Sequence, residues 1–78
     1  MSNIWIEIES TNQIIEVTGF TYDKQLFGNK YSFTVYCAEI SMTIKSNITE
    51  EEAKYEYDLW KSWIAEGKYH LIQIEKEQ

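Results

Sequence analysis

The sequence predicts an α+β domain in which one amphipathic helix packs on one face of a mostly antiparallel sheet. Several short segments alternate apolar and polar residues with the period of two that is typical of half-buried strands. Residues 49–67 instead combine a helix start, a helical apolar period and a glycine stop. The expected order of elements is β-β-β-α-β, within a single domain that spans residues 1–78.

The first two strands are expected at residues 3–9 and 13–22, joined as a hairpin by a polar turn. Three isoleucines in the first strand share one parity, and the opposite parity holds Trp5, Glu7 and Glu9. In the second strand Ile15 and Val17 are expected to face the core, and the outward residues are Ile14, Glu16 and Thr18. Gly19 indicates a bulge or a close backbone approach.

A second hairpin is predicted around Gly28-Asn29, because both residues tolerate a positive φ. The β-like run at residues 31–45 then changes phase midway, since Cys37 belongs to one apolar parity and Ile40 to the other. Either a bulge near Ala38-Glu39 or a tight turn between two strands explains this change. We favour the bulge, because no Gly, Pro or Asn marks a turn at this point.

The predicted helix begins after Thr49, whose side chain can form a capping box with Glu52. Acidic residues fill its first turn and complement the helix dipole, and Gly67 is a natural stop. The residues expected to form its buried stripe are Ala53, Tyr57, Trp60 and Ile64. Residues 69–75 alternate again and are expected to form the last strand.

Composition excludes several classes of function. The chain has 13 acidic and seven basic residues, for a formal charge of −6, and every basic residue is a lysine. Direct nucleic-acid binding needs a basic face, which this chain lacks, so a basic protein partner is favoured instead. Cys37 is the only cysteine, and the sequence shows neither a signal-peptide pattern nor a long apolar run. We therefore expect a cytoplasmic protein that does not contact membranes.

No catalytic, metal-binding or cofactor-binding constellation is expected. The only pairing of a nucleophile with a base is Cys37 with His70, and both share strand parity with apolar residues. Nucleophilic catalysis would require the two side chains to meet and a third group to orient the base. One Cys and one His also lack the ligand spacing of a zinc site. We therefore expect a protein that is not an enzyme.

Partner-binding residues are sought among charges and apolar groups that stability does not explain. Glutamates of like charge gather at outward positions of two paired strands, where they repel one another. Apolar residues at outward positions resemble interface anchors, or are covered by a second copy of the chain in a homodimer. The predicted partner-binding residues are Trp5, Glu7, Glu9, Glu16, Tyr55 and Leu59.

The chain also resembles small phage-encoded proteins of the host-takeover and anti-defence kind, which include anti-CRISPR proteins. The resemblance lies in size, acidity and the tail that runs from Ile48-Thr49-Glu50-Glu51-Glu52-Ala53 to Gly67-Lys68-Tyr69-His70-Leu71-Ile72. It implies an inhibitor in the cytoplasm of the host that docks on a basic, nucleic-acid-binding site of a defence or nucleic-acid-processing protein. It further implies that carboxylates stand where DNA phosphates would lie. The rival expectation is an assembly protein that forms a homo-oligomer through its exposed sheet face.

Overall fold

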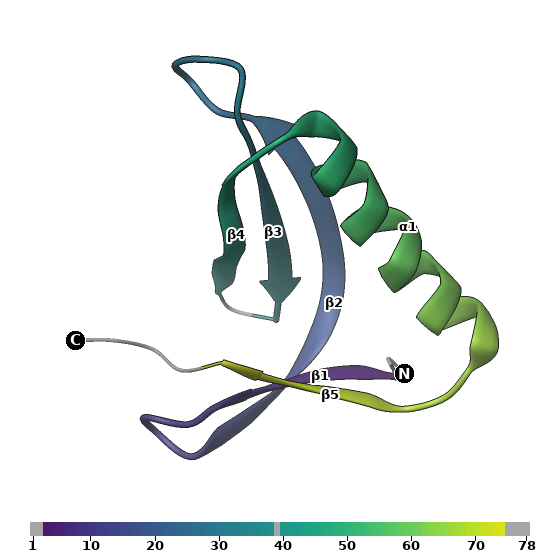
Figure 1. Cartoon of the computed structure of the whole chain (residues 1–78). Coiled ribbons are helices and arrows are strands. Elements are labelled where there is room, and N and C mark those ends of the chain that lie inside the picture. The colour runs from purple at the N-terminus through teal and green to yellow at the C-terminus, as the bar shows by residue number, and fades with distance from the viewer. Residues whose placement is uncertain (1–2, 39, 75–78) are drawn as a thin grey trace.

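A computed structural model describes residues 3–38 and 40–74, and in them one helix packs against one side of a five-stranded sheet (Figure 1). The strands are β1 (Ile4–Ile8), β2 (Gln13–Lys24), β3 (Tyr31–Cys37), β4 (Ser41–Ile48) and β5 (His70–Ile74). The helix α1 (Glu50–Glu66) lies between β4 and β5 in the chain. The predicted α+β class and mostly antiparallel sheet are confirmed.

The sheet has the order β4-β3-β2-β1-β5, in which β1 to β4 form an antiparallel meander and β5 lies parallel to β1. Residues 13–16 of β2 pair with β1, whereas its residues 17–24 pair with β3. The register shifts between Val17 and Gly19, which is the bulge that the glycine indicated. Figure 1 shows that β2 is curved, so that β1 and β5 run across the direction of β3 and β4.

The favoured reading of residues 31–45 as one bulged strand is wrong. The run is two antiparallel strands, β3 and β4, so the order of elements is β-β-β-β-α-β. The chain reverses after Cys37, whose backbone N–H donates to the Ile40 carbonyl at 2.8 Å. Most residue types are compatible with the commonest tight turn, so the lack of Gly, Pro or Asn did not exclude one. Glu39, where the bulge was expected, lies outside the described residues.

The core lies between the sheet and α1. Its buried cluster comes from β1, β2, β3 and the helix, and its members are Ile4, Ile6, Ile8, Val17, Phe33, Val35 and Trp60. The Trp60 ring lies 5.0 Å from Phe33 and 5.5 Å from Phe20, as measured between ring centroids, in the tilted and edge-on contacts that aromatic rings prefer. Its indole N–H donates to Glu56 at 3.1 Å, so the buried polar atom is satisfied.

The start and end of α1 agree with the sequence prediction. The Thr49 backbone N–H donates to the Glu52 carboxylate at 2.9 Å, and the Glu52 N–H donates to the Thr49 hydroxyl at 3.1 Å. Hydrogen bonding of the Glu52 carboxyl to the backbone and the side chain of Thr49, helped by the charges of Lys30 and Lys45, lowers the pKa of that carboxyl from its ordinary value. Gly67 ends the helix with φ of 73°, a left-handed conformation that glycine adopts without strain.

Two expectations about the faces of α1 are corrected. Ile64 was expected in the buried stripe but is 51% exposed, and Trp63 packs against the core instead. Ile64 instead lines a depression whose other walls are residues 3–4 and residues 16–20, at the bulge of β2. Leu59 was expected to point away from the core but packs against it.

Candidate protein-binding face

The face of the sheet opposite α1 presents two adjoining rows of side chains from β5, β1 and β2. In one row Leu71, Trp5 and Glu16 are cross-strand neighbours, and in the next the neighbours are Gln73, Glu7 and Ile14. The alternate residues of the same strands point into the core, so these six side chains point outward. We call this set the outer patch. Ile14 and Leu71 are 59% and 51% exposed, whereas Trp5 is half-buried among its neighbours.

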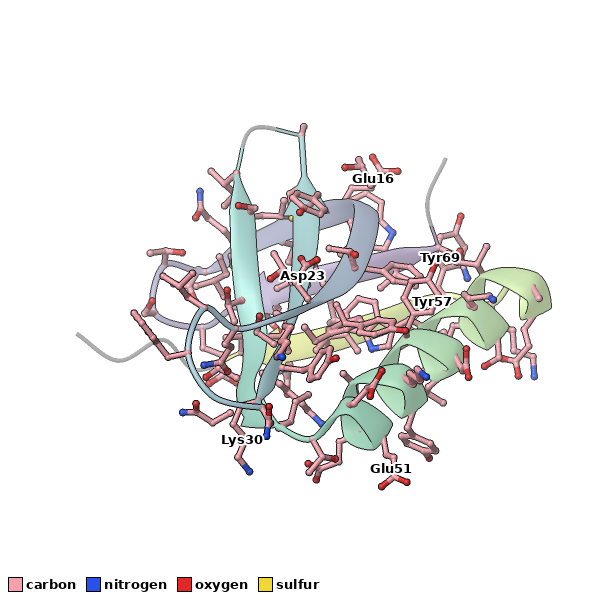
Figure 2. All side chains as sticks on the ribbon, turned by 90° about the horizontal axis from the view of Figure 1, so that it is seen from above. Glu16, Asp23, Lys30, Glu51, Tyr57 and Tyr69 are labelled. Carbon is pink, nitrogen blue, oxygen red and sulfur yellow. The ribbon has the colours of Figure 1, made fainter. Side chains whose placement is uncertain are left out.

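The charge of this side of the sheet is negative. Among the described strand residues of outward parity, the charged ones are Glu7, Glu16 and Asp23. Lys45 points to the helix side, where its ammonium group contacts Glu56 at 2.8 Å. Glu7 of β1 accepts a hydrogen bond from the Gln73 amide of β5 at 3.0 Å, which ties its carboxylate to the neighbouring strand. Figure 2 shows Tyr57 between the strands and α1, where it packs against the core.

A depression of about 380 Å³ adjoins the outer patch at the bulge of β2. Glu16 belongs to both, because it lines the depression and pairs with Trp5 across the strands. The apolar part of the lining includes Phe20 and the exposed Ile64. The Asn3 amide, also in the lining, donates to the carbonyls of Trp63 and Lys68 at 2.8 and 2.6 Å and so joins β1 to the end of α1.

The structure brings together three of the six predicted partner-binding residues. Trp5, Glu7 and Glu16 share the outer patch. Glu9 lies just beyond β1, in the turn, where its backbone N–H donates to the Ile74 carbonyl at 3.1 Å. Tyr55 is exposed on α1, which covers the other side of the sheet, so it does not contribute to the same surface.

The sequence analysis selected neither of the exposed aliphatic residues of this surface, Ile14 and Leu71, although it expected Ile14 to face outward. Leu71 adjoins Trp5 because β5 pairs with β1 in parallel, with the two residues opposite each other. The alternation of residues 69–75 already indicated that Leu71 has the opposite parity to His70 and Ile72. What the sequence lacked was the pairing partner of this strand, which depends on the path of the helix.

Cys37 and His70 do not form a catalytic pair in the described structure. They lie in β3 and β5, with β2 and β1 between, which is a separation of about 14 Å at the usual strand spacing. Cys37 is buried, and burial raises the pKa of its thiol, so the unreactive protonated form is favoured. The imidazole of His70 stacks on Trp63 with the ring centroids 4.3 Å apart.

Within residues 3–38 and 40–74, no group of three or more His, Cys, Asp or Glu side chains is placed to hold a metal ion. In the same part of the chain, no helix is both long and apolar enough to cross a membrane. Comparison with protein-family models, with curated proteins and with solved structures found no match to the chain.

Proposed function

We propose that this chain is a non-catalytic protein-binding domain whose outer patch docks onto a basic surface of a larger protein. The observation that carries the proposal is the mixture of exposed apolar and acidic groups on one face, with Trp5 between Leu71 and Glu16. Aromatic side chains rimmed by charge are typical anchors of protein interfaces. A face built for solvent alone would not need Ile14 and Leu71 exposed side by side with the glutamates.

The two kinds of side chain have different roles in the proposed interaction. Glu7 and Glu16, together with the net charge of −6, attract a basic partner and raise the association rate. Trp5 and its apolar neighbours are removed from water at contact and slow dissociation. The β-bulge beside Glu16 leaves a depression into which a side chain of the partner can insert.

In its more specific form, the proposal makes the chain an inhibitor that occupies a nucleic-acid-binding site. The outward charged strand residues in the described part of the chain are all acidic, so carboxylates can replace phosphates on a basic site. The resemblance to small phage-encoded inhibitors supports this form. It predicts that nucleic acid and this chain compete for the same partner.

The test is affinity capture from the native host with three baits, read by mass spectrometry. The first bait is the wild type, and the second carries Glu7→Lys with Glu16→Lys. The third carries Glu51→Lys with Asp58→Lys on exposed positions of α1, which gives the same net charge as the second. We expect the wild type and the α1 variant to capture the same basic protein, and the outer-patch variant to lose it.

Capture of the same protein by all three baits would contradict the proposal, because the outer patch would then not be the binding surface. Loss of capture by both variants would show that only net charge matters. Circular dichroism of each bait provides the control for folding. Displacement of the captured protein by a DNA or RNA duplex separates an inhibitor of nucleic-acid binding from an adaptor.

A further inference from the structure

The loop between β2 and β3 presents two large apolar side chains to solvent. Leu26 and Phe27 are 89% and 83% exposed, the highest values among the large apolar residues that the structure describes. We call these two residues the Leu-Phe tip. The loop is at the top of Figure 1, at the far end of the molecule from β1 and β5.

The base of this loop is held in place. The Gln25 N–H donates to the Lys30 carbonyl at 2.8 Å, which closes the loop. The Gln25 side chain accepts from the Asn47 N–H at 2.6 Å and donates to the Asn47 side chain at 3.2 Å, which fixes the loop to β4. A fixed loop loses little conformational entropy on binding, so the exposed tip is prepared for contact.

Two lysines, Lys24 and Lys30, flank the Leu-Phe tip in the sequence, whereas the charged residues of the outer patch are glutamates. The outer patch needs an occupant that is apolar and basic, and the Leu-Phe tip with its flanking lysines has both properties. The chain therefore carries a segment with the chemistry that its own outer patch selects.

We propose that the Leu-Phe tip of one copy docks on the outer patch of a second copy. This inference rests on the proposed function of the outer patch and names a second occupant for it, one that competes with the basic partner. Within one copy the tip cannot reach the patch, because the loop with Lys30 and the strands with Glu16 lie at opposite ends of the molecule (Figures 1 and 2). The interface is head-to-tail, so it forms a ring or an open chain of copies.

The strength of this self-association is limited by two factors. Each copy has a net charge of −6, so copies repel one another at long range. Salt at physiological concentration screens that repulsion beyond about 8 Å, whereas contacts between the tip and the patch are shorter. A small interface of this kind belongs to the weak, transient class, so a tighter basic partner displaces it.

The first test is sedimentation velocity of the purified chain from about 10 μM to about 1 mM, a range that covers weak association. We expect the wild type to sediment faster as concentration rises. The tip variant, Leu26→Ser with Phe27→Ser, and the patch variant, Ile14→Lys with Leu71→Lys, are expected to remain monomeric. The matched control is Ile40→Lys with Tyr55→Lys, which changes the charge equally at exposed apolar positions elsewhere and should associate like the wild type.

The decisive test mixes the tip variant with the patch variant. The first retains an intact patch and the second an intact tip, so the mixture is expected to form a one-to-one dimer that cannot extend. In a mixture of isotope-labelled and unlabelled chains, intermolecular NMR contacts are expected between the ring of Phe27 and the indole of Trp5.

A wild type that stays monomeric throughout, a tip variant that still associates, or a mixture that stays monomeric would overturn the inference. None of these results affects the proposed function, which is decided by capture of a basic protein with the outer-patch baits. The reverse result is also distinguishable. If the wild-type bait captures no basic protein but the wild type still self-associates, only a second copy occupies the patch.

Discussion

The two faces of the sheet differ in the way they use aromatic and acidic residues. On the inner face Trp60 is 1% exposed, packs against Phe20 and Phe33, and gives its N–H to Glu56. On the outer face Trp5 is half-buried beside Leu71 and Glu16, with exposed Ile14 nearby. Tryptophan and glutamate therefore complete the core on the inner face, whereas on the outer face they lie beside apolar side chains that remain exposed to solvent.

This difference separates the residues that fold the chain from those that we propose for binding. Substitutions on the inner face should lower the free energy of unfolding, because they create cavities or leave buried polar groups without hydrogen-bond partners. Substitutions on the outer patch should leave the fold nearly intact and change association. The comparison would fail if an inner-face substitution changed only association, or if an outer-patch substitution mainly lowered the free energy of unfolding.

The largest effect is expected for Trp60→Ala. The indole fills the space between α1 and the sheet, so its removal should lower the free energy of unfolding by about 3–5 kcal/mol. For a domain of 78 residues this is a large share of the total stability. Urea unfolding followed by circular dichroism measures it, and a loss below about 1 kcal/mol would contradict the assignment of Trp60 to the core.

Trp5→Ala should affect partner affinity more than stability. Because Trp5 is only half-buried on the outer face, the free energy of unfolding should fall by about 1–2 kcal/mol, well under the Trp60→Ala value. The affinity for the captured partner should fall at least about tenfold, as expected for an aromatic anchor. Calorimetric titration measures the affinity, and a variant that unfolds but binds normally when folded would reverse the comparison.

Thr49→Ala should have a smaller effect, confined to stability. The variant loses the hydroxyl that accepts from the Glu52 N–H, and helix caps of this type contribute about 1 kcal/mol. Partner affinity should not change, because Thr49 lies at the start of α1 and outside the outer patch. Thr49→Ser keeps the hydroxyl and serves as the control, with stability close to that of the wild type.

The smallest effect concerns the pH dependence of stability through Glu52. Its pKa is lower in the folded chain than in the unfolded chain, so ionised Glu52 stabilises the fold at neutral pH. This contribution is complete above the unfolded value of about 4.3 and is lost as the pH falls through the lower folded value. The difference in stability between the wild type and Glu52→Gln should therefore become smaller below about pH 4. Thermal unfolding of both proteins in a pH series measures this difference.

Much of the fold was predictable because local signals agree with the tertiary structure. The alternation in β1, the glycine at the bulge and the capping box of α1 each specified a feature that the structure contains. The division of residues 31–45 into two strands was not chosen, because its turn carries none of the usual turn residues. Similarly, helical spacing alone placed Ile64 in the core, but the depression that leaves it exposed is a tertiary property.

The candidate site was predictable only in part. Outward parity identified Trp5, Glu7 and Glu16, since alternation within a strand needs no knowledge of the rest of the chain. Leu71 joins them through parallel pairing of β5 with β1, which a single sequence does not encode locally. Tyr55 was grouped with Trp5 by its exposed character, although the sheet separates the two.

The most direct test of the account measures the affinity for the captured partner over a series of salt concentrations. For the wild type, affinity should fall steadily as salt rises, because the acidic outer patch attracts a basic surface. Glu7→Lys with Glu16→Lys should bind more weakly and respond less to salt, whereas Glu51→Lys with Asp58→Lys should follow the wild type. An affinity that stays constant across the series, or equal behaviour of the two variants, would contradict the account.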